Sequence, residues 1–180
     1  YTLDICAKVV EVIKRDIKRP DLVVHYKQVN TDSRFAALID GEIDMECGNT
    51  TNTTERRKKV AFTIPTFIAA TRLLVRTDSG IKSISNLAGK TVVADKGSSG
   101  DKIFTDLNAT RTLRANLVHA NESDESFAMV DSGKADAYIT DDILLYTLRA
   151  SSKTPEKFEV TRDALTIEPL AVMLRKDDPA

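Results

Sequence analysis

The chain contains two copies of one local pattern, and this internal repeat constrains the fold more than any other feature. Phe35–Asp44 aligns without gaps on Phe127–Asp136. Each copy predicts a helix anchored by phenylalanine and ended by a glycine, Gly41 or Gly133, followed by a strand that opens with aspartate. A chance match is the alternative, because Gly and Asp are common in such places. The better interpretation is two lobes of the same architecture.

The remaining sequence alternates helical and strand patterns. Pro20 ends a first helix over 3–17, and Thr31 or Asp32 can cap a second helix that ends at 39. Further helices are predicted from 101 onward and over 124–130 and 142–148. Strands are predicted at 22–26, 43–47, 91–94, 116–119, 137–140, 158–160 and 170–174, with a loop over 48–59 and a long extended segment over 66–75 that joins the lobes. This alternation indicates an α/β fold with mainly parallel pairing.

Composition excludes several classes of protein. Among 180 residues, 26 Lys and Arg balance 27 Asp and Glu, so there is no basic excess of the kind that nucleic-acid binding requires. No apolar run approaches the roughly 20 residues of a membrane helix. Tyr1 leads directly into a helical pattern, without the basic and apolar regions of a signal peptide, as in a mature or truncated chain.

The two cysteines, Cys6 and Cys47, are too few for a disulfide scaffold and lack the spacing of a zinc site. They fit one structural bridge in an oxidising compartment, or two buried thiols in any compartment. The turn at 97–100 is not followed by Gly-Lys-Ser/Thr, so it is no nucleotide P-loop. Neither a metal nor a cofactor is expected.

Polar residues follow the strand in each copy of the repeat. Asn49 and Asp141 lie five residues after the shared aspartate. Open parallel sheets bind ligands at the carboxyl ends of their strands. The repeat therefore predicts that polar residues from both lobes face one cleft.

In the first lobe, Asn49, Thr51 and Arg56 form a candidate anion site. The planar guanidinium of arginine matches a carboxylate in bidentate fashion, and Thr and Asn add short-range donors. The alternative is that the basic run at 56–59 is a solvated surface patch.

In the second lobe, Ser98 and Ser99 stand at a predicted helix start, where backbone N–H groups and the helix dipole favour an anion. The alternative is simple N-capping. Asp141 can accept an ammonium group, or cap the helix that follows it. Two anion sites and one cation site predict a receptor for a zwitterion.

The segments 44–56 and 60–63 resemble the first-lobe signature of the family 3 periplasmic solute-binding proteins, which serve ABC importers of polar amino acids. Further similarity lies at 71–75, 87–93, 125–127 and 173–179, and it is closest to the glutamate/aspartate-binding branch. The resemblance implies a two-lobed type II (Venus-flytrap) fold with mainly parallel sheets. Lobe 1 would comprise 1–72 and 170–180, lobe 2 would comprise 73–169, and the hinge strands would lie near 69–73 and 168–172. Family members have a strand before Tyr1 and helices after Ala180, so lobe 1 is expected to be incomplete here.

The resemblance also assigns roles around the amino-acid backbone of the ligand. Arg56 corresponds to the arginine that binds the α-carboxylate, assisted by Thr51 and Ser99. Asp141 corresponds to the acceptor of the α-ammonium, with Asn49 contributing from lobe 1.

For the ligand side chain, Arg34 and Thr31 match the pair that reaches the second carboxylate. Ser123 stands where that branch has a histidine, which removes one possible cation. The resemblance also favours a Cys6–Cys47 bridge, because it places Cys6 on the first helix of lobe 1, Cys47 on the strand beneath it, and the protein in the periplasm.

The function implied is binding of a free polar amino acid, glutamate or aspartate, and its delivery to the permease of an ABC transporter by a periplasmic monomer that is not an enzyme. Two alternatives stay open. One is an enzyme on the same fold, such as a cyclohexadienyl dehydratase, and the other is the ligand-sensing domain of a receptor.

Overall fold

The computed structural model describes residues 1–178, which form two compact units. Unit 1 contains Tyr1–Val29, Ser33–Ile68 and the described residues from Pro169 onward. Unit 2 contains Asn30–Asp32 and Ala69–Glu168. The lobe boundaries expected from the resemblance, at 72 and 169, lie in the strands β3 (Phe67–Arg76) and β8 (Thr166–Leu174). Pro179, the last residue of the similar segment, and Ala180, the last residue of the expected lobe 1, lie outside the described residues.

Unit 1 is built on a short antiparallel arrangement of strands. Its elements are α1 (Thr2–Asp16), α2 (Arg34–Ile39), β1 (Met45–Thr51), η1 (Arg56–Lys58) and β2 (Ala61–Phe62). The end of β8 pairs with both β1 and β2. Leu38, Val60 and Met173 form its buried core, with Phe35 packed against it.

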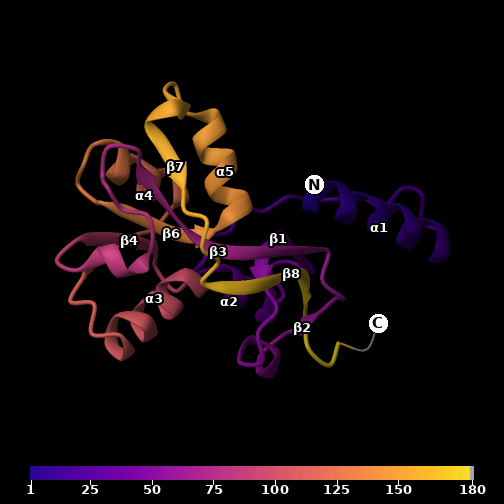
Figure 1. Cartoon of the computed structure of the whole chain (residues 1–180). Helices are drawn as coiled ribbons and strands as arrows, with labels where there is room; N and C mark the ends of the chain where they lie inside the picture. Colours follow the sequence, from indigo (N-terminus) through magenta and orange to yellow (C-terminus); the bar gives the residue numbers. More distant parts are fainter. Residues whose placement is uncertain (179–180) are drawn as a thin grey trace. The chain divides into compact units, whose positions relative to one another are not determined.

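The predicted first helix is confirmed as α1, and the predicted bridge is present. Cys6 is the one buried residue of this helix, and it forms a disulfide with Cys47 of β1 across a Cα–Cα distance of 6.4 Å. Much of α1 projects beyond the strands of unit 1 (Figure 1). The disulfide therefore links α1 covalently to β1.

The prediction of a strand at 22–26 is wrong. This segment is irregular and solvent-exposed, with Val23 at 69% and Tyr26 at 77% exposure. A strand needs a partner that satisfies its backbone N–H and C=O groups. Among the described residues, none of the strand pairings includes this segment, so its β-branched residues do not make it a strand.

Two boundaries in unit 1 also differ from the prediction. α2 begins at Arg34 with Ser33 as its N-cap, and not with Thr31 or Asp32. The strand expected at 43–47 begins at Met45 and continues to Thr51, into the predicted loop. It continues because Thr50 and Thr51 resume pairing with β8 after an irregularity in the register.

Unit 2 contains a mixed sheet in which β4 pairs in parallel with both β5 and β6. β3 pairs antiparallel with β6 and β7. The strands other than β3 are β4 (Thr91–Asp95), β5 (Asn116–Ala120), β6 (Ala137–Asp141) and β7 (Phe158–Val160). The α/β class is confirmed, and within unit 2 the parallel pairs described are those of β4 with β5 and β6, while β3 pairs antiparallel with β6 and β7. Helical crossovers connect β4, β5 and β6 in sequence, whereas β3 and β8 join their neighbours without such a crossover.

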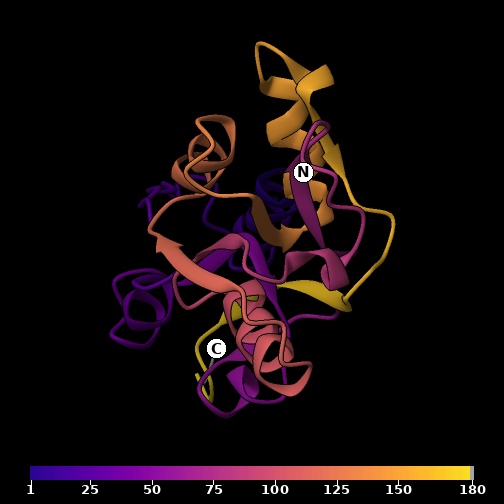
Figure 2. The same ribbon diagram turned by 60° about the vertical axis from the view of Figure 1, so that its left-hand side comes forward.

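The helices of unit 2 cover both faces of its sheet. α3 (Ser99–Thr110) lies on one face, and α4 (Ser123–Asp131) and α5 (Asp142–Ser151) lie on the other, as Figures 1 and 2 show. The cores follow the strand alternation, because Val92 packs with Phe104 of α3 while Val93 packs with Leu145 of α5. Two short 3-10 turns, η2 (Ile84–Leu87) and η3 (Pro155–Lys157), complete the unit.

The predicted repeat is confirmed as local structure. Helix α2 is followed by Gly41 at φ +76°, and α4 is followed by Gly133 at φ +75°. Asp44 and Asp136 then directly precede β1 and β6. One copy lies in unit 1 and the other in unit 2. Within the described part of the chain, no helix is long and apolar enough to cross a membrane.

Candidate functional site

In unit 1, Arg34 is a buried cation at the start of α2. Its side chain is 8% exposed, and its Nη1 donates to Thr50 Oγ1 at 2.7 Å. Burying a guanidinium is unfavourable unless hydrogen bonds and charge compensate it. The structure therefore holds Arg34 in a defined position.

Arg56 differs from its basic neighbours. It is half-buried in η1, and its Nη1 donates to the backbone O of Thr51 at 3.0 Å. Arg57, Lys58 and Lys59 are exposed. The basic run at 56–59 is thus not a uniformly solvated patch, because its first arginine is turned inward.

Both arginines contact the ring of Phe35. The guanidinium carbon of Arg34 lies 5.7 Å from the ring centroid, and that of Arg56 lies 5.5 Å from it. A cation over an aromatic face is attracted to the ring, more strongly where water is excluded. Sequence reasoning missed this role, since it assigned Phe35 only as a helix anchor. No spacing in the sequence links Phe35 to Arg56.

An irregularity in β1 positions the remaining residues of unit 1. Glu46 pairs with Met173 and Thr50 pairs with Ala171, so three residues of β1 stand opposite one residue of β8. Such bulges redirect side chains. Asn49 is exposed as a result, while Thr51, like Thr50, is buried beside the arginines.

In unit 2, the predicted residues gather at one edge of the sheet. β4, β5 and β6 are parallel, so their carboxyl ends share that edge. Ser98 and Ser99 follow β4, Ser123 follows β5, and Asp141 ends β6. The structure thus brings together four of the predicted residues, as the strand pattern indicated.

The start of α3 is capped by its own residues. Ser98 Oγ accepts from the backbone N of Asp101 at 3.1 Å, and Asp101 Oδ2 accepts from the N of Gly97 at 3.0 Å. His119 Nε2 lies 2.8 Å from the other oxygen of Asp101. Ser98 therefore caps the helix, which is the alternative to an anion site, and Ser99 is the half-buried first residue of the helix.

Ser123 belongs to a cluster around a buried carboxylate that sequence reasoning missed. Asp95, the last residue of β4, accepts hydrogen bonds from Ser123 Oγ at 2.8 Å, Ser126 Oγ at 2.6 Å and Tyr138 OH at 2.7 Å. Burial raises the pKa of Tyr138 far above its usual value, and the charge of Asp95 raises it further. Tyr138 therefore remains a donor. The single proton of Ser123 is directed at Asp95.

Asp141 and Thr31 are the remaining predicted residues that lie in unit 2. Asp141 is buried, at 4% exposure, and occupies the N-cap position of α5. Its neighbour Asp142 accepts from Arg72 Nε at 3.2 Å, which attaches α5 to β3. Thr31 is half-buried in the short segment that clusters with unit 2, whereas Arg34 belongs to unit 1.

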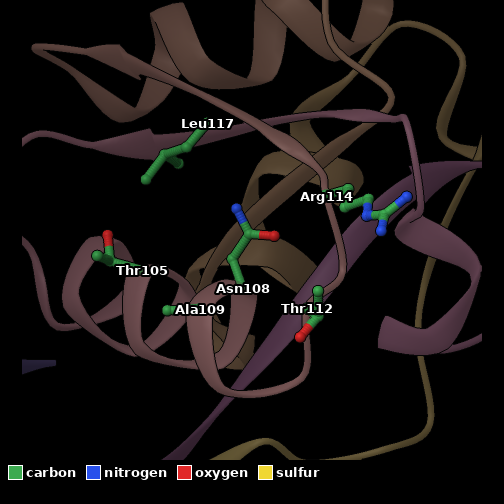
Figure 3. A pocket seen from close by; sticks show the side chains of 6 residues that line it. All are labelled: Thr105, Asn108, Ala109, Thr112, Arg114 and Leu117. Atoms are coloured by element: carbon green, nitrogen blue, oxygen red, sulfur yellow. The ribbon is translucent and has the colours of Figure 1, made fainter.

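A pocket of about 450 Å³ lies elsewhere in unit 2, at the end of α3. Its lining residues are Thr105, Asn108, Ala109, Thr112, Arg114 and Leu117, and none of them is a predicted site residue (Figure 3). The amide of Asn108 exchanges hydrogen bonds with the backbone of Ala115 at 2.9 and 3.1 Å. The described residues contain no group of three or more His, Cys, Asp or Glu that could hold a metal ion.

Gly100 brings the start of α3 against β6, next to Asp141. A Cβ at this position would lie 2.7 Å from the backbone O of Ile139. Gly100→Ala is therefore expected to lower the free energy of unfolding by about 1–3 kcal/mol, because α3 must shift from the sheet. Urea denaturation measures this loss. Thr105→Ala, at an exposed position of the same helix, is the matched control, and equal stability of the two variants would contradict the prediction.

The sequence and structure are similar to those of known proteins along nearly the whole chain. The L-glutamate/L-aspartate-binding protein of Pseudomonas aeruginosa is 37% identical over 180 residues, which cover 100% of this chain and 60% of that protein. The glutamate/aspartate import solute-binding protein of Escherichia coli is 35% identical over 179 residues, covering 99% of this chain and 59% of the relative. The chain thus spans about 60% of the length of these relatives.

Among solved structures, the ancestral amino-acid-binding protein AncCDT-1, described as a precursor of cyclohexadienyl dehydratase, superimposes with a TM-score of 0.75 at 28% identity. The match covers 88% of this chain and 66% of that one. The bacterial extracellular solute-binding proteins, family 3, match residues 4–180. The chain, with its repeated helix–glycine–strand pattern and its similarity to these proteins, belongs to this family.

Proposed function

We propose that this chain binds a free acidic amino acid, glutamate or aspartate, outside the cytoplasm and delivers it to the permease of an ABC transporter. The observation that carries the proposal is the placement of Arg34 and Arg56 around the ring of Phe35 in unit 1. Two arginines held in this way provide two positions for carboxylates. The named relatives, glutamate/aspartate-binding proteins, support an acidic ligand.

The groups of the ligand backbone are assigned to five residues. Arg56 binds the α-carboxylate through its guanidinium, with hydroxyl donors from Thr51 and Ser99. Asp141 accepts the α-ammonium, and Asn49 contributes from β1. A bidentate arginine–carboxylate pair supplies both affinity and orientation.

The side-chain carboxylate of the ligand is assigned to Arg34, with Thr31 as a further contact. Ser123 adds little for an acidic side chain, because its proton is directed at Asp95. Ser98 supports the loop before α3 through its cap. The chain acts as a periplasmic monomer in this proposal and contains no catalytic residue.

A second candidate function is a dehydratase activity on the same fold. The similarity to a precursor of cyclohexadienyl dehydratase supports it. This activity requires a proton donor beside a bound organic acid, and it yields a new product. Incubation with cyclohexadienyl acids and analysis of products by mass spectrometry distinguish the two, because a binding protein returns its ligand unchanged.

The binding function is tested with Arg56→Ala and its neighbour Arg57→Ala. A thermal-shift screen of twenty amino acids identifies the ligand, since a ligand at a hundred times its Kd adds about 2.7 kcal/mol of stability. Calorimetry is then expected to show a loss of about thirtyfold in affinity, near 2 kcal/mol, for Arg56→Ala, because the carboxylate loses its bidentate partner. Arg57→Ala, at an exposed position, is expected to leave affinity unchanged.

Two results of these experiments would contradict the proposed binding function. Equal losses for the two variants would mean that the basic run acts only as a diffuse surface charge. A wild-type chain that binds no amino acid would refute the proposed function.

A further inference from the structure

Unit 1 contains a buried acid, Glu46, to which the proposed binding mode gives no role. Its side chain is 5% exposed, and its Oε2 accepts a hydrogen bond from Thr50 Oγ1 at 2.8 Å. The same hydroxyl accepts from Arg34 Nη1 at 2.7 Å. One threonine hydroxyl thus links the buried acid to the buried arginine.

The backbone of β1 is shaped to hold this acid in place. Glu46 and Thr50 flank the bulge, so their side chains approach each other across the intervening residues. Gly48 lies under the Glu46 side chain, and a Cβ there would stand 2.2 Å from Glu46 Oε1. Only glycine leaves room for the carboxylate in this position.

We infer that Glu46 is a specificity-determining residue, which sets how strongly the site prefers an acidic over an uncharged side chain. The inference rests on the proposed function, in which Arg34 binds the side-chain carboxylate of the ligand. Through the hydroxyl of Thr50, the carboxylate of Glu46 places a negative charge near the guanidinium of Arg34. It reduces the positive potential that an incoming carboxylate meets, while Thr50 keeps the guanidinium in place.

The effect depends on charge and therefore differs between ligands. A glutamate carboxylate on Arg34 would lie within several ångströms of Glu46, where like charges repel by about 1–3 kcal/mol at an effective dielectric constant near 20. The neutral amide of glutamine does not experience this repulsion. Glu46 therefore weakens glutamate binding relative to glutamine binding, and its removal is expected to raise the ratio of the two affinities by about tenfold.

The test measures this glutamate-to-glutamine affinity ratio by calorimetry in four proteins. Glu46→Gln keeps an acceptor for Thr50 and removes the charge, so the ratio is expected to rise about tenfold. Glu46→Asp keeps the charge and shortens the side chain, so the ratio is expected to stay within about twofold of wild type. Glu42→Gln is the matched control, because Glu42 is an exposed acid of unit 1 paired with Lys27.

Gly48→Ala provides a second route if Glu46→Gln does not fold. Only the flexible end of Glu46 must move to admit the new methyl group, so the carboxylate leaves Thr50 and the ratio is expected to rise by a smaller factor. A merely structural role for Glu46 would lower stability without changing the ratio, and that result would overturn the inference. So would equal changes for Glu46→Gln and Glu42→Gln.

Failure of the inference and failure of the proposed function remain distinguishable. A wild-type chain that binds glutamate and responds to Arg56→Ala, but shows an unchanged ratio in Glu46→Gln, overturns the inference alone. A wild-type chain that binds neither amino acid overturns both.

Discussion

Replacing Cys6 and Cys47 together by serine is expected to lower the free energy of unfolding of unit 1 by about 4 kcal/mol. The bridge closes a loop across a sequence separation of 41, and a loop of that length removes roughly this much chain entropy from the unfolded state. This loss of stability is expected to be concentrated in α1. Cys6 is the one buried residue of α1, so the helix would keep mainly the contacts of Tyr1 with Thr66 and Phe67 at its start.

The measurement is chemical denaturation of the double variant and of wild type without reductant, together with hydrogen exchange of the α1 amides. Exchange is expected to become fast in α1 first. Wild type treated with dithiothreitol should match the variant, and the variant itself should not respond to dithiothreitol. Equal stability of wild type with and without reductant would contradict the prediction.

Replacing Asp95 by alanine is expected to lower the free energy of unfolding of unit 2 by about 3–5 kcal/mol. Three hydroxyl groups donate to this carboxylate, and those of Ser126 and Tyr138 belong to buried residues. A buried donor that loses its acceptor costs about 1–3 kcal/mol. Asp95→Asn keeps one acceptor oxygen and is expected to lose about half as much.

Urea denaturation checks these values. The matched control is Asp106→Ala, because Asp106 is an exposed acid of unit 2 whose pair with Lys102 is worth about 0–1 kcal/mol. A loss below about 1 kcal/mol for Asp95→Ala would show that neighbouring groups replace the lost acceptor.

The sequence predicted most of unit 2 because its signals are local. The apolar run Val92–Ala94 and the glycine after each repeat helix are signals that depend on neighbouring residues only, and the structure confirms the strand and both glycine conformations. The segment at 22–26 has an equally strong strand pattern and is not a strand. Its pattern indicates only a high β-propensity. A strand also requires a neighbouring strand with which to pair, and the local sequence does not show whether one is present.

The site was predictable only in part, for a similar reason. Residue chemistry singled out Arg56, and the strand order placed Ser99 and Asp141 at one sheet edge. The cluster around the buried carboxylate of Asp95, which contains Ser123, is held by residues that are distant in the sequence. Asp95 binds hydroxyls 28, 31 and 43 positions away, and no motif marks such a partner.

The ring of Phe35 has a consequence for how recognition energy is distributed. Because Arg34 and Arg56 both rest on it, a change at either arginine alters the packing and polarisation felt by the other. In the proposed binding mode, their contributions to ligand affinity would therefore be non-additive, and the sum of two single substitutions would differ from the effect of the double substitution. Selectivity for the ligand side chain and affinity for the ligand backbone would then form one thermodynamically coupled property of Arg34, Arg56 and Phe35, in which a substitution of either arginine would change both.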